Sequence, residues 1–247
     1  MRGIEVRNLV DYSIKYSEEN FESIQVGYRR RKVIEQIKKY QPKRCLEIGC
    51  GMAPLFLYDE EREYTIIEPS EKFFNNAVSL AKNKKVNCIR GYFENLATEI
   101  EKKWDMIICS SLLHEVEEPD ILLESIRRTC GENTIVHINV PNADSMHRLL
   151  AKESGMIEDV HERSERNILY QQKNVFDIKE LKKIIKKHDM CIIDEGSYFI
   201  KPFSHEQMYK IVSMGIIEEA ILEGLYNMEK FMPGMGSELF VNCKVNN

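Results

Sequence analysis

The chain has 247 residues, 43% of them hydrophobic, and a formal net charge of -5 at pH 7. This length and composition suffice for one domain with a full hydrophobic core. The acidic balance argues against a broad nucleic-acid-binding surface, and no apolar run approaches the ~20 residues that cross a bilayer. The start, MRGIEVRN, carries charges where a signal peptide needs apolar residues. We therefore expect a cytoplasmic protein, a monomer or homodimer, whose partner is a small molecule and neither nucleic acid nor a membrane.

Seven cysteines are spread singly through the chain, without a C-x-x-C pair. This pattern favours small buried thiols over disulfides or a zinc site. We expect the thiols to be reduced and the protein to hold no metal.

The first 40 residues are expected to form an N-terminal helical arm. From about Ser23 to Tyr40, apolar residues recur at three- and four-residue steps, which predicts a helix. Its basic run at residues 29–32 is most often just a solvated helix face.

A buried strand that meets a tight turn is the most informative stretch of the chain. The apolar run at residues 45–48 is too short for a helix, and Gly49 and Gly51 after it let backbone come close to a ligand. The motif E-I-G-C-G resembles the first motif of class I S-adenosylmethionine (SAM)-dependent methyltransferases, with Glu47 at the position of the motif's acid. A nicotinamide-binding turn would need a third glycine where this chain has Pro54.

An acid ends the next predicted strand. Residues 64–67 are rich in β-branched side chains, and Glu68 and Pro69 follow them, about 20 residues after Glu47. A carboxylate at this position can accept hydrogen bonds from both ribose hydroxyls of a nucleoside. The alternative is a polar residue that only ends a strand.

The third predicted strand, at residues 86–90, follows a helix expected from about residue 71 to 83. Methyltransferases of this class bind the adenine edge just after this strand, often with an acidic side chain. Tyr92 stands where the acid often is, so the resemblance implies recognition by the amides and rings of Tyr92 and Phe93. Core packing explains Phe93 nearly as well.

The block W-D-M-I-I-C-S-S-L-L-H-E-V, beginning at Trp104, resembles the fourth methyltransferase motif. Its first half predicts a buried strand. The resemblance places the residues after this strand beside the adenosine and methionine of the cofactor. His114 and Glu115 come just past that edge, where the transferred methyl group should point.

Residues 142–174 are longer than an ordinary connection, which predicts a helical substrate lid. Charged residues of such helices mostly face water. A polar lid nonetheless suits a hydrophilic acceptor, and Arg148 or Arg166 could hold a carboxylate or phosphate bidentately. His147 and His161 are the lid histidines expected to contribute to the site.

Strands and helices alternate through the rest of the chain. Further elements are predicted as a strand at 134–140 with His137 in the core, a helix at 176–188, a strand from 191, a helical region at 205–228 and a strand at 238–245. The alternation predicts an α/β fold with a doubly wound, mostly parallel seven-stranded sheet. By family resemblance the last strand runs antiparallel. We expect one domain over residues 1–247, made of the arm (1–40), a SAM-binding core (41–141), the lid (142–174) and a C-terminal part of the sheet and helices (175–247).

The resemblance implies methyl transfer from SAM, with S-adenosylhomocysteine (SAH) as product. The leading hypothesis is O-methylation of a small polar metabolite, such as a sugar or a phosphorylated or carboxylated compound, with His114 as base. Alternatives are N-methylation of a small amine, a catalytically silent SAM-binding partner protein, and an NAD-linked dehydrogenase.

The expected site residues fall into three groups. In the resembling family the segment before the first strand often folds over the cofactor, which adds Tyr28 and Arg30. The catalytic residues are His114 and His147; the cofactor-binding residues are Tyr28, Arg30, Glu47, Gly49, Gly51, Glu68, Pro69, Tyr92, Phe93, Ser110, Ser111 and Leu112; the substrate-binding residues are Glu115, Arg148, His161, Arg166 and Tyr170.

Overall fold

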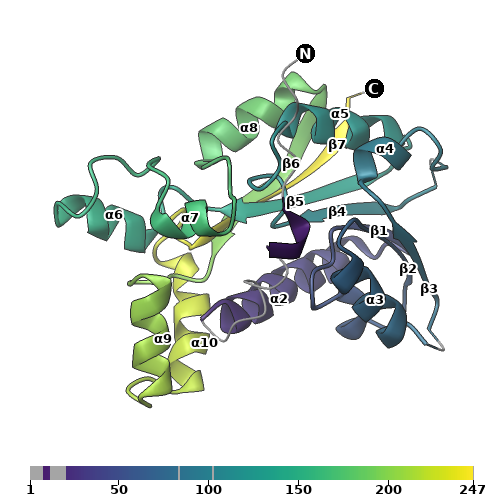
Figure 1. Ribbon diagram of the computed structural model, residues 1–247. Helices are drawn as coiled ribbons and strands as arrows, with labels where there is room; N and C mark the ends of the chain where they lie inside the picture. The colour runs from purple at the N-terminus through teal and green to yellow at the C-terminus, as the bar shows by residue number, and fades with distance from the viewer. Residues whose placement is uncertain (1–7, 12–20, 83, 102, 247) are drawn as a thin grey trace.

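The computed structural model describes residues 8–11, 21–82, 84–101 and 103–246. The rest of the predicted arm lies outside these residues. Seven strands form one sheet in the order β3-β2-β1-β4-β5-β7-β6, with helices on both faces (Figure 1). The strands are β1 Arg44–Ile48, β2 Glu63–Glu68, β3 Val86–Arg90, β4 Met106–Ser110, β5 Ile135–Pro141, β6 Met190–Tyr198 and β7 Glu238–Val245. The α/β, doubly wound, mostly parallel seven-stranded sheet is therefore confirmed.

Helices connect the strands and cover the sheet. Those of the core are α2 Glu22–Tyr40, α3 Glu71–Leu80, α4 Phe93–Leu96, α5 Pro119–Thr129 and α8 Ile178–Lys187; those of the insertion and the C-terminal region are α6 Met146–Glu153, α7 Glu165–Leu169, α9 His205–Ser213 and α10 Glu219–Asn227; the 3-10 helices are η1 Leu55–Leu57 and η2 Met228–Lys230.

Side chains of the central strands alternate between two apolar clusters, one on each face of the sheet. On β4, Met106 and Ile108 belong to one cluster, and Ile107 and Cys109 belong to the other. Helices α2 and α3 cover the first face, and α4, α5 and α8 cover the second (Figure 1). A strand buried on both faces has a continuous apolar sequence, which is why M-I-I-C predicts β4.

The last strand runs antiparallel, as the resemblance implied. β7 lies between β5 and β6 and pairs antiparallel with both, whereas β3, β2, β1, β4 and β5 pair in parallel. Parallel strands place their carboxyl ends at one edge of the sheet. The segments that follow β1, β2 and β4 therefore meet there.

The helical region after β6 is divided in two. Helix α9 ends at Ser213, and α10 begins at Glu219. Between them Gly215 has a φ of 67°, the left-handed conformation that commonly ends a helix. The predicted lid also contains two short helices, α6 and α7.

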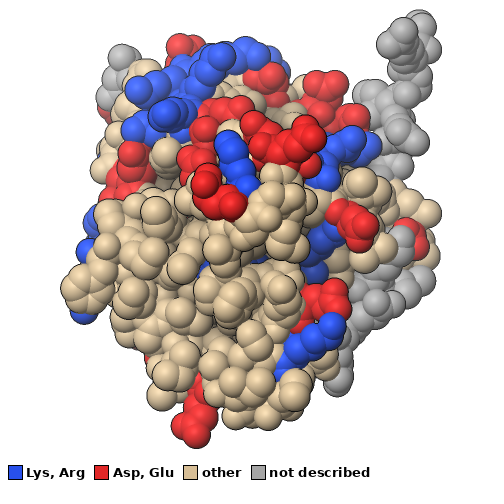
Figure 2. All heavy atoms as spheres, turned by 90° about the vertical axis from the view of Figure 1, so that its left-hand side faces the viewer, with Lys and Arg blue, Asp and Glu red and all other residues tan. Residues whose placement is uncertain are grey.

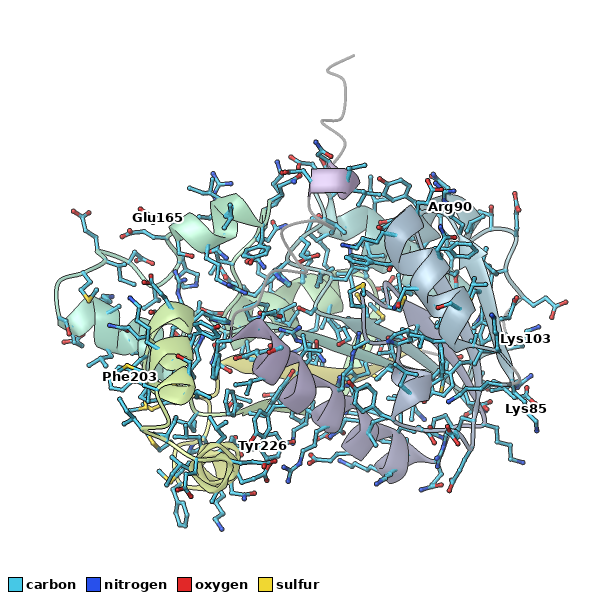
Figure 3. All side chains as sticks on the ribbon, turned by 60° about the horizontal axis from the view of Figure 1, so that its bottom comes forward. Lys85, Arg90, Lys103, Glu165, Phe203 and Tyr226 are labelled. Carbon is cyan, nitrogen blue, oxygen red and sulfur yellow. The ribbon has the colours of Figure 1, made fainter. Side chains whose placement is uncertain are left out.

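A third apolar cluster joins α2 to α9 and α10. Tyr28 on α2 stacks on Phe199, with ring centroids 4.4 Å apart, and on Tyr226 of α10 at 5.3 Å. Tyr226 is labelled in Figure 3. Figure 2 shows the side of the molecule that carries α6, α9 and α10, where uncharged side chains cover much of the lower half. Exposed apolar residues in and around α9, α10 and η2 are Phe203, Met214, Ile216, Ile221 and Phe231.

The cysteines are free thiols. Cys191 on β6 is exposed and Cys88 is half-buried; the other five are buried. Burial raises the pKa of the Cys109 thiol to about 12. Among the described residues, no helix combines the length and the apolar character needed to span a membrane.

Candidate active site

A cavity of about 450 Å³ opens at the carboxyl ends of β1, β2 and β4. This is the edge of a doubly wound sheet where ligands bind. Predicted residues from the helix α2 and from four motifs line it together. They are Arg30, Gly49, Gly51, Glu68, Pro69, Tyr92, Phe93, Ser110, Ser111, Leu112 and Glu115.

The turn after β1 has a backbone conformation that favours glycine. Gly49 and Gly51 have φ angles of 73° and 56°, in the left-handed region that most side chains disfavour. The Gly49 amide donates to the carbonyl oxygen of Ile67 on β2 at 2.9 Å. A Cβ at Gly49 would lie 3.6 Å from Leu112, an ordinary contact. The backbone conformation, not a lack of space, therefore requires glycine there.

The Glu68 carboxylate holds this turn from the end of β2. Its Oε2 accepts hydrogen bonds from the amides of Cys50 at 3.0 Å and Gly51 at 3.3 Å, and its Oε1 accepts one from the amide of Ser70 at 2.9 Å. Burial raises the pKa of Glu68, although these hydrogen bonds oppose the rise. A carboxylate has about four acceptor positions. Oε1 therefore retains one, which fits a ribose hydroxyl.

Glu47 supports the turn from within the sheet and is not a residue of the cavity wall. It is fully buried; its Oε1 lies 3.1 Å from Arg30 Nη1, and its Oε2 accepts from the Leu55 amide at 3.0 Å. Burial raises the pKa of Glu47 to about 7. Arg30 also donates from Nη2 to the Cys50 carbonyl oxygen at 2.8 Å, while its Nε is buried without a hydrogen-bond partner. Arg30 thus holds both Glu47 and the turn after β1.

Two residues at the expected adenine end differ in accessibility. Tyr92 is 38% exposed, and Phe93 is buried in the core cluster as well as lining the cavity. The next residue, Glu94, also lines the cavity, and burial raises its pKa. The acid of the resembling family corresponds to position 92, where this chain has Tyr92. Glu94, two residues further on in the motif G-Y-F-E-N-L, was not predicted to line the site.

Tyr28 lies elsewhere. Within the described part of the chain it lines neither this cavity nor the smaller one next to it. Its ring packs between Phe199 and Tyr226. Its neighbour Arg29 faces both cavities instead.

A second, smaller cavity of about 100 Å³ adjoins the first, because Arg29, Ser111 and Glu115 line both. The second cavity gathers the predicted catalytic histidines and most of the predicted substrate residues. They are His114, Glu115, His147, Arg148, Arg166 and Tyr170.

His114 is 2% exposed and lies in the loop after β4. Its Nε2 is 3.8 Å from Glu115 Oε1. The His114 carbonyl oxygen accepts hydrogen bonds from the amides of Lys173 and Asn174 at 3.0 Å each. The end of the lid insertion is therefore fixed directly to the loop that carries His114.

The two predicted lid arginines already have partners. Arg166 Nη2 donates to Glu22 Oε2 at 2.7 Å, and its guanidinium lies 4.5 Å from the centre of the Tyr170 ring. Arg148 donates from Nε to the Val160 carbonyl oxygen at 2.7 Å and from Nη2 to the carbonyl oxygen of Glu162. Arg148 thus binds the lid's own backbone.

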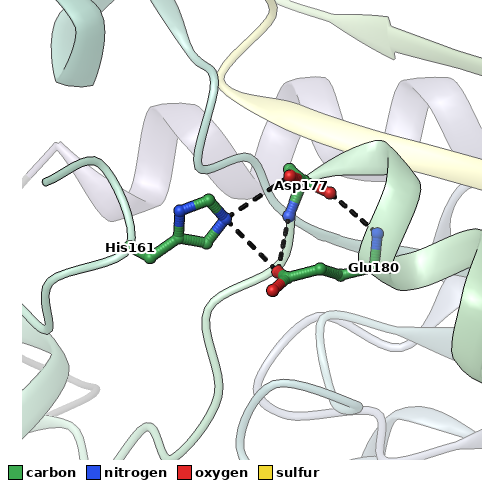
Figure 4. Close-up of side chains that lie close together, drawn as sticks. All are labelled: His161, Asp177 and Glu180. Carbon is green, nitrogen blue, oxygen red and sulfur yellow. Dashed lines mark hydrogen bonds and ion pairs between the residues drawn. The ribbon is translucent and has the colours of Figure 1, made fainter.

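His161 lies outside both cavities, on the connection between α6 and α7. Its Nε2 is 3.3 Å from Glu180 Oε2 and 3.5 Å from Asp177 Oδ2 (Figure 4). Asp177 and Glu180 also cap the start of α8 through a reciprocal capping box. This cap accounts for the two neighbouring carboxylates, and His161 attaches the lid to it.

The second cavity contains a polar network that the sequence reasoning missed. Glu238, at the start of β7, lies 2.9 Å from Arg29 Nε and accepts from Tyr198 Oη at 2.6 Å. Lys201 and His205 also line this cavity, and Lys201 is 1% exposed. These residues lie on separate elements and meet through long-range packing. No local sequence motif therefore marks them.

Residues 25–194, more than half of the chain, match the family described as "Methyltransferase domain". The chain belongs to this methyltransferase family. It is a class I SAM-dependent methyltransferase, as the motifs predicted, and SAM is its cofactor. No curated protein matches the sequence.

Solved structures share the methyltransferase fold at low sequence identity. The plantazolicin methyltransferase BamL, in complex with triazolic desmethylPZN analog and SAH, is 17% identical, with 95% of this chain and 89% of that chain covered and a TM-score of 0.60. The 1,6-didemethyltoxoflavin-N1-methyltransferase of Burkholderia thailandensis is 12% identical, with coverage of 96% and 88% and a TM-score of 0.61. The [4+2]-cyclase SpnF is 15% identical, with coverage of 87% and 81% and a TM-score of 0.59.

The larger cavity has the groups that a SAM site needs. Glycine backbone lines one wall, the Glu68 carboxylate lies at the end of β2, and the side chain of Arg30 lines the cavity as well. When bound, SAM supplies a methyl group on a positively charged sulfur. The residues of the chain have to hold the acceptor next to it, exclude water and take up a proton.

Proposed function

We propose that this methyltransferase O-methylates a small polar metabolite that binds in the second cavity. The supporting observation is the buried pair of His114 and Glu115, because Glu115 lines the wall that the two cavities share. A volume of about 100 Å³ is well below the ~300–1,000 Å³ of pockets for drug-sized ligands. It suits a small polar acceptor.

The residues act by positioning and proton transfer. Holding an acceptor oxygen in line with the methyl carbon removes much of the barrier. His114 takes the hydroxyl proton as general base, an effect of typically ~10²–10⁴-fold, and Glu115 orients the acceptor. His147 is the second histidine in this cavity. The residues of the larger cavity bind SAM, with Glu68 on the ribose and Tyr92 and Phe93 at the adenine.

N-methylation of an amine is the alternative. One similar structure is described as an N1-methyltransferase, and another, from Thermotoga maritima, as a possible histamine N-methyltransferase. A neutral amine needs no strong base. N-methylation therefore predicts that turnover survives the loss of His114.

The test uses deuteromethyl-labelled SAM with a pooled metabolite extract, and mass spectrometry to find labelled products. We expect products methylated on oxygen. His114→Gln should then lower kcat by roughly 10²-fold or more while the Kd for SAH stays unchanged.

His188→Gln is the matched control, because His188 follows α8, pairs with Asp120 on α5 and lines neither cavity. It should keep full turnover. Products methylated only on nitrogen, or a His114→Gln variant with the wild-type rate, would contradict the proposal.

A further inference from the structure

We propose that the second cavity contains an anion-binding subsite centred on Lys201, so that the methyl acceptor carries a carboxylate or phosphate group. This inference rests on the proposed function, because it takes the second cavity as the acceptor site. Lys201 follows β6 and lies outside every sequence motif considered above. An anion-binding subsite at this residue specifies the chemical class of the methyl acceptor.

The side chain of Lys201 is enclosed and only partly used. Its exposure is 1%, and its Nζ lies 2.6 Å from His205 Nδ1. Among the described residues it forms no ion pair with a carboxylate. An ammonium group has three donors, and the contact with His205 uses one. Two donors therefore remain for a ligand in the cavity.

The other cations of this cavity are committed to partners. Arg29 is paired with Glu238 and Glu22, and Arg166 with Glu22. Arg148 binds carbonyl oxygens of the lid. These contacts also occupy the carboxylates, so an incoming anion meets Lys201 without having to break an existing ion pair.

A second donor lies in the same cavity. His147, on α6, has a buried Nδ1 with no hydrogen-bond partner. Leaving such an atom unsatisfied costs free energy, which a ligand oxygen accepting from the Nδ1–H tautomer would recover. Lys201 and His147 thus offer an anion donors from two different elements.

The charges around Lys201 make this subsite sensitive to pH. The pKa of Lys201 is lowered to about 7, chiefly by burial and also by Arg166 and Arg29, while Glu22 and Glu238 oppose the change. Burial also lowers the pKa values of the neighbouring His147 and His205, so both imidazoles are neutral near pH 7. A bound anion favours the charged amine. The affinity for acetate, which stays ionised over this range, should therefore rise as the pH falls from 8 to 6.

The experiment measures anion binding to the SAH-saturated protein. Acetate and inorganic phosphate are titrated separately at constant ionic strength, and binding is followed by saturation transfer to the acetate methyl protons and by the ³¹P linewidth of phosphate. We expect at least one of the two to bind, about tenfold or more weaker in Lys201→Met. His147→Phe should weaken binding less, because Lys201 remains.

Lys210→Met is the matched control, since Lys210 on α9 is exposed, pairs with Glu206 across one helical turn and lines neither cavity. It should bind as wild type does. The inference is wrong if the SAH complex binds neither anion, if Lys201→Met binds both as well as wild type, or if the affinity for acetate does not depend on pH between 6 and 8.

Failure of the inference can be distinguished from failure of the proposed function. Labelled, O-methylated products that carry no anionic group would leave the proposed function standing and overturn the role of Lys201. The opposite outcome is also distinct. Products that are methylated on nitrogen and bear a carboxylate, with anion binding that Lys201→Met removes, would overturn O-methylation and leave the role of Lys201 standing. SAH binding, measured first by calorimetry, shows that every variant is folded.

Discussion

Glu68 has two roles at the scale of the single residue. It accepts hydrogen bonds from the backbone of the glycine turn and from Ser70, and it retains one acceptor position at Oε1. The first role shapes the turn after β1, and under the proposed function the second is available to the ribose. An ionised carboxylate has acceptor positions for both.

Glu68→Gln should weaken SAH binding by about 10- to 100-fold, because it replaces one of the two acceptor oxygens by an amide donor, which then faces either the Cys50 and Gly51 amides or the Ser70 amide. Calorimetry with SAH provides the measurement. Since burial raises the pKa of Glu68, wild-type affinity should also fall on acidification at a higher pH than for an exposed carboxyl. Glu71→Gln, an exposed residue paired with Arg90, is the control. A Kd for SAH within twofold of wild type in Glu68→Gln would exclude this role.

Residues with a local motif could be located from the sequence, and residues placed by long-range packing could not. Gly49 comes directly after β1, and Glu68 ends β2. Both strands could be predicted from the sequence, and parallel strands place their carboxyl ends at one edge of the sheet, so the meeting of the two residues could be predicted as well. Lys201 looks like a solvated lysine in a loop, but it is buried in a cavity to which α2, α7, α9 and β7 also contribute side chains. Tyr28 sits one position from Arg29, and the helical pattern alone cannot tell which of the two faces the cavities.

At the scale of the element, the lid is attached at defined points. Its last residues bind the His114 carbonyl oxygen, Arg148 joins α6 to the loop before α7, and His161 reaches the cap of α8. The His161 contact is exposed. Exposed ion pairs of this kind contribute about 0.2–1 kcal/mol.

His161→Gln should therefore loosen the lid locally. We expect amide hydrogen exchange at residues 156–164 to accelerate by up to about fivefold, because 1 kcal/mol changes an opening equilibrium by that factor. The Kd for SAH should not change, since His161 lines neither cavity. Mass spectrometry of deuterium uptake measures this. Equal acceleration in β1 and β4 would instead indicate a global loss of stability.

The elements themselves were predicted with small errors at their ends. β3 has the predicted bounds, and the other strands agree within a few residues, since buried strands have continuous apolar sequences. The single helical region predicted at 205–228 is two helices, because a glycine at position 215 can end a helix or be tolerated inside one. The antiparallel direction of β7 came from the family resemblance, whereas its position between β5 and β6 was not predicted.

At the scale of the whole molecule, segments far apart in the sequence form the larger cavity. They include α2 and the loops after β1, β2 and β4. A ligand there contacts all of them at once and binds only the folded state. It should therefore stabilise the entire domain.

SAH at about 100 times its Kd should raise the free energy of unfolding by about 2.7 kcal/mol and Tm by roughly 5–10 °C for a chain of this size. Differential scanning calorimetry measures the shift. NADH at the same concentration is the control and should leave Tm unchanged, since Pro54 replaces the third glycine of a dinucleotide site. A shift with NADH and none with SAH would refute the assignment of the cavity.

The distribution of the thiols makes the molecule suitable for selective labelling. Cys191 is the one exposed cysteine of the seven, and burial raises the pKa values of Cys45, Cys50, Cys88, Cys109 and Cys243, which keeps their thiols unreactive. A maleimide fluorophore added to the native protein would attach to β6, at the margin of the sheet. The natural sequence thus already carries a reporter position that lies in neither cavity wall.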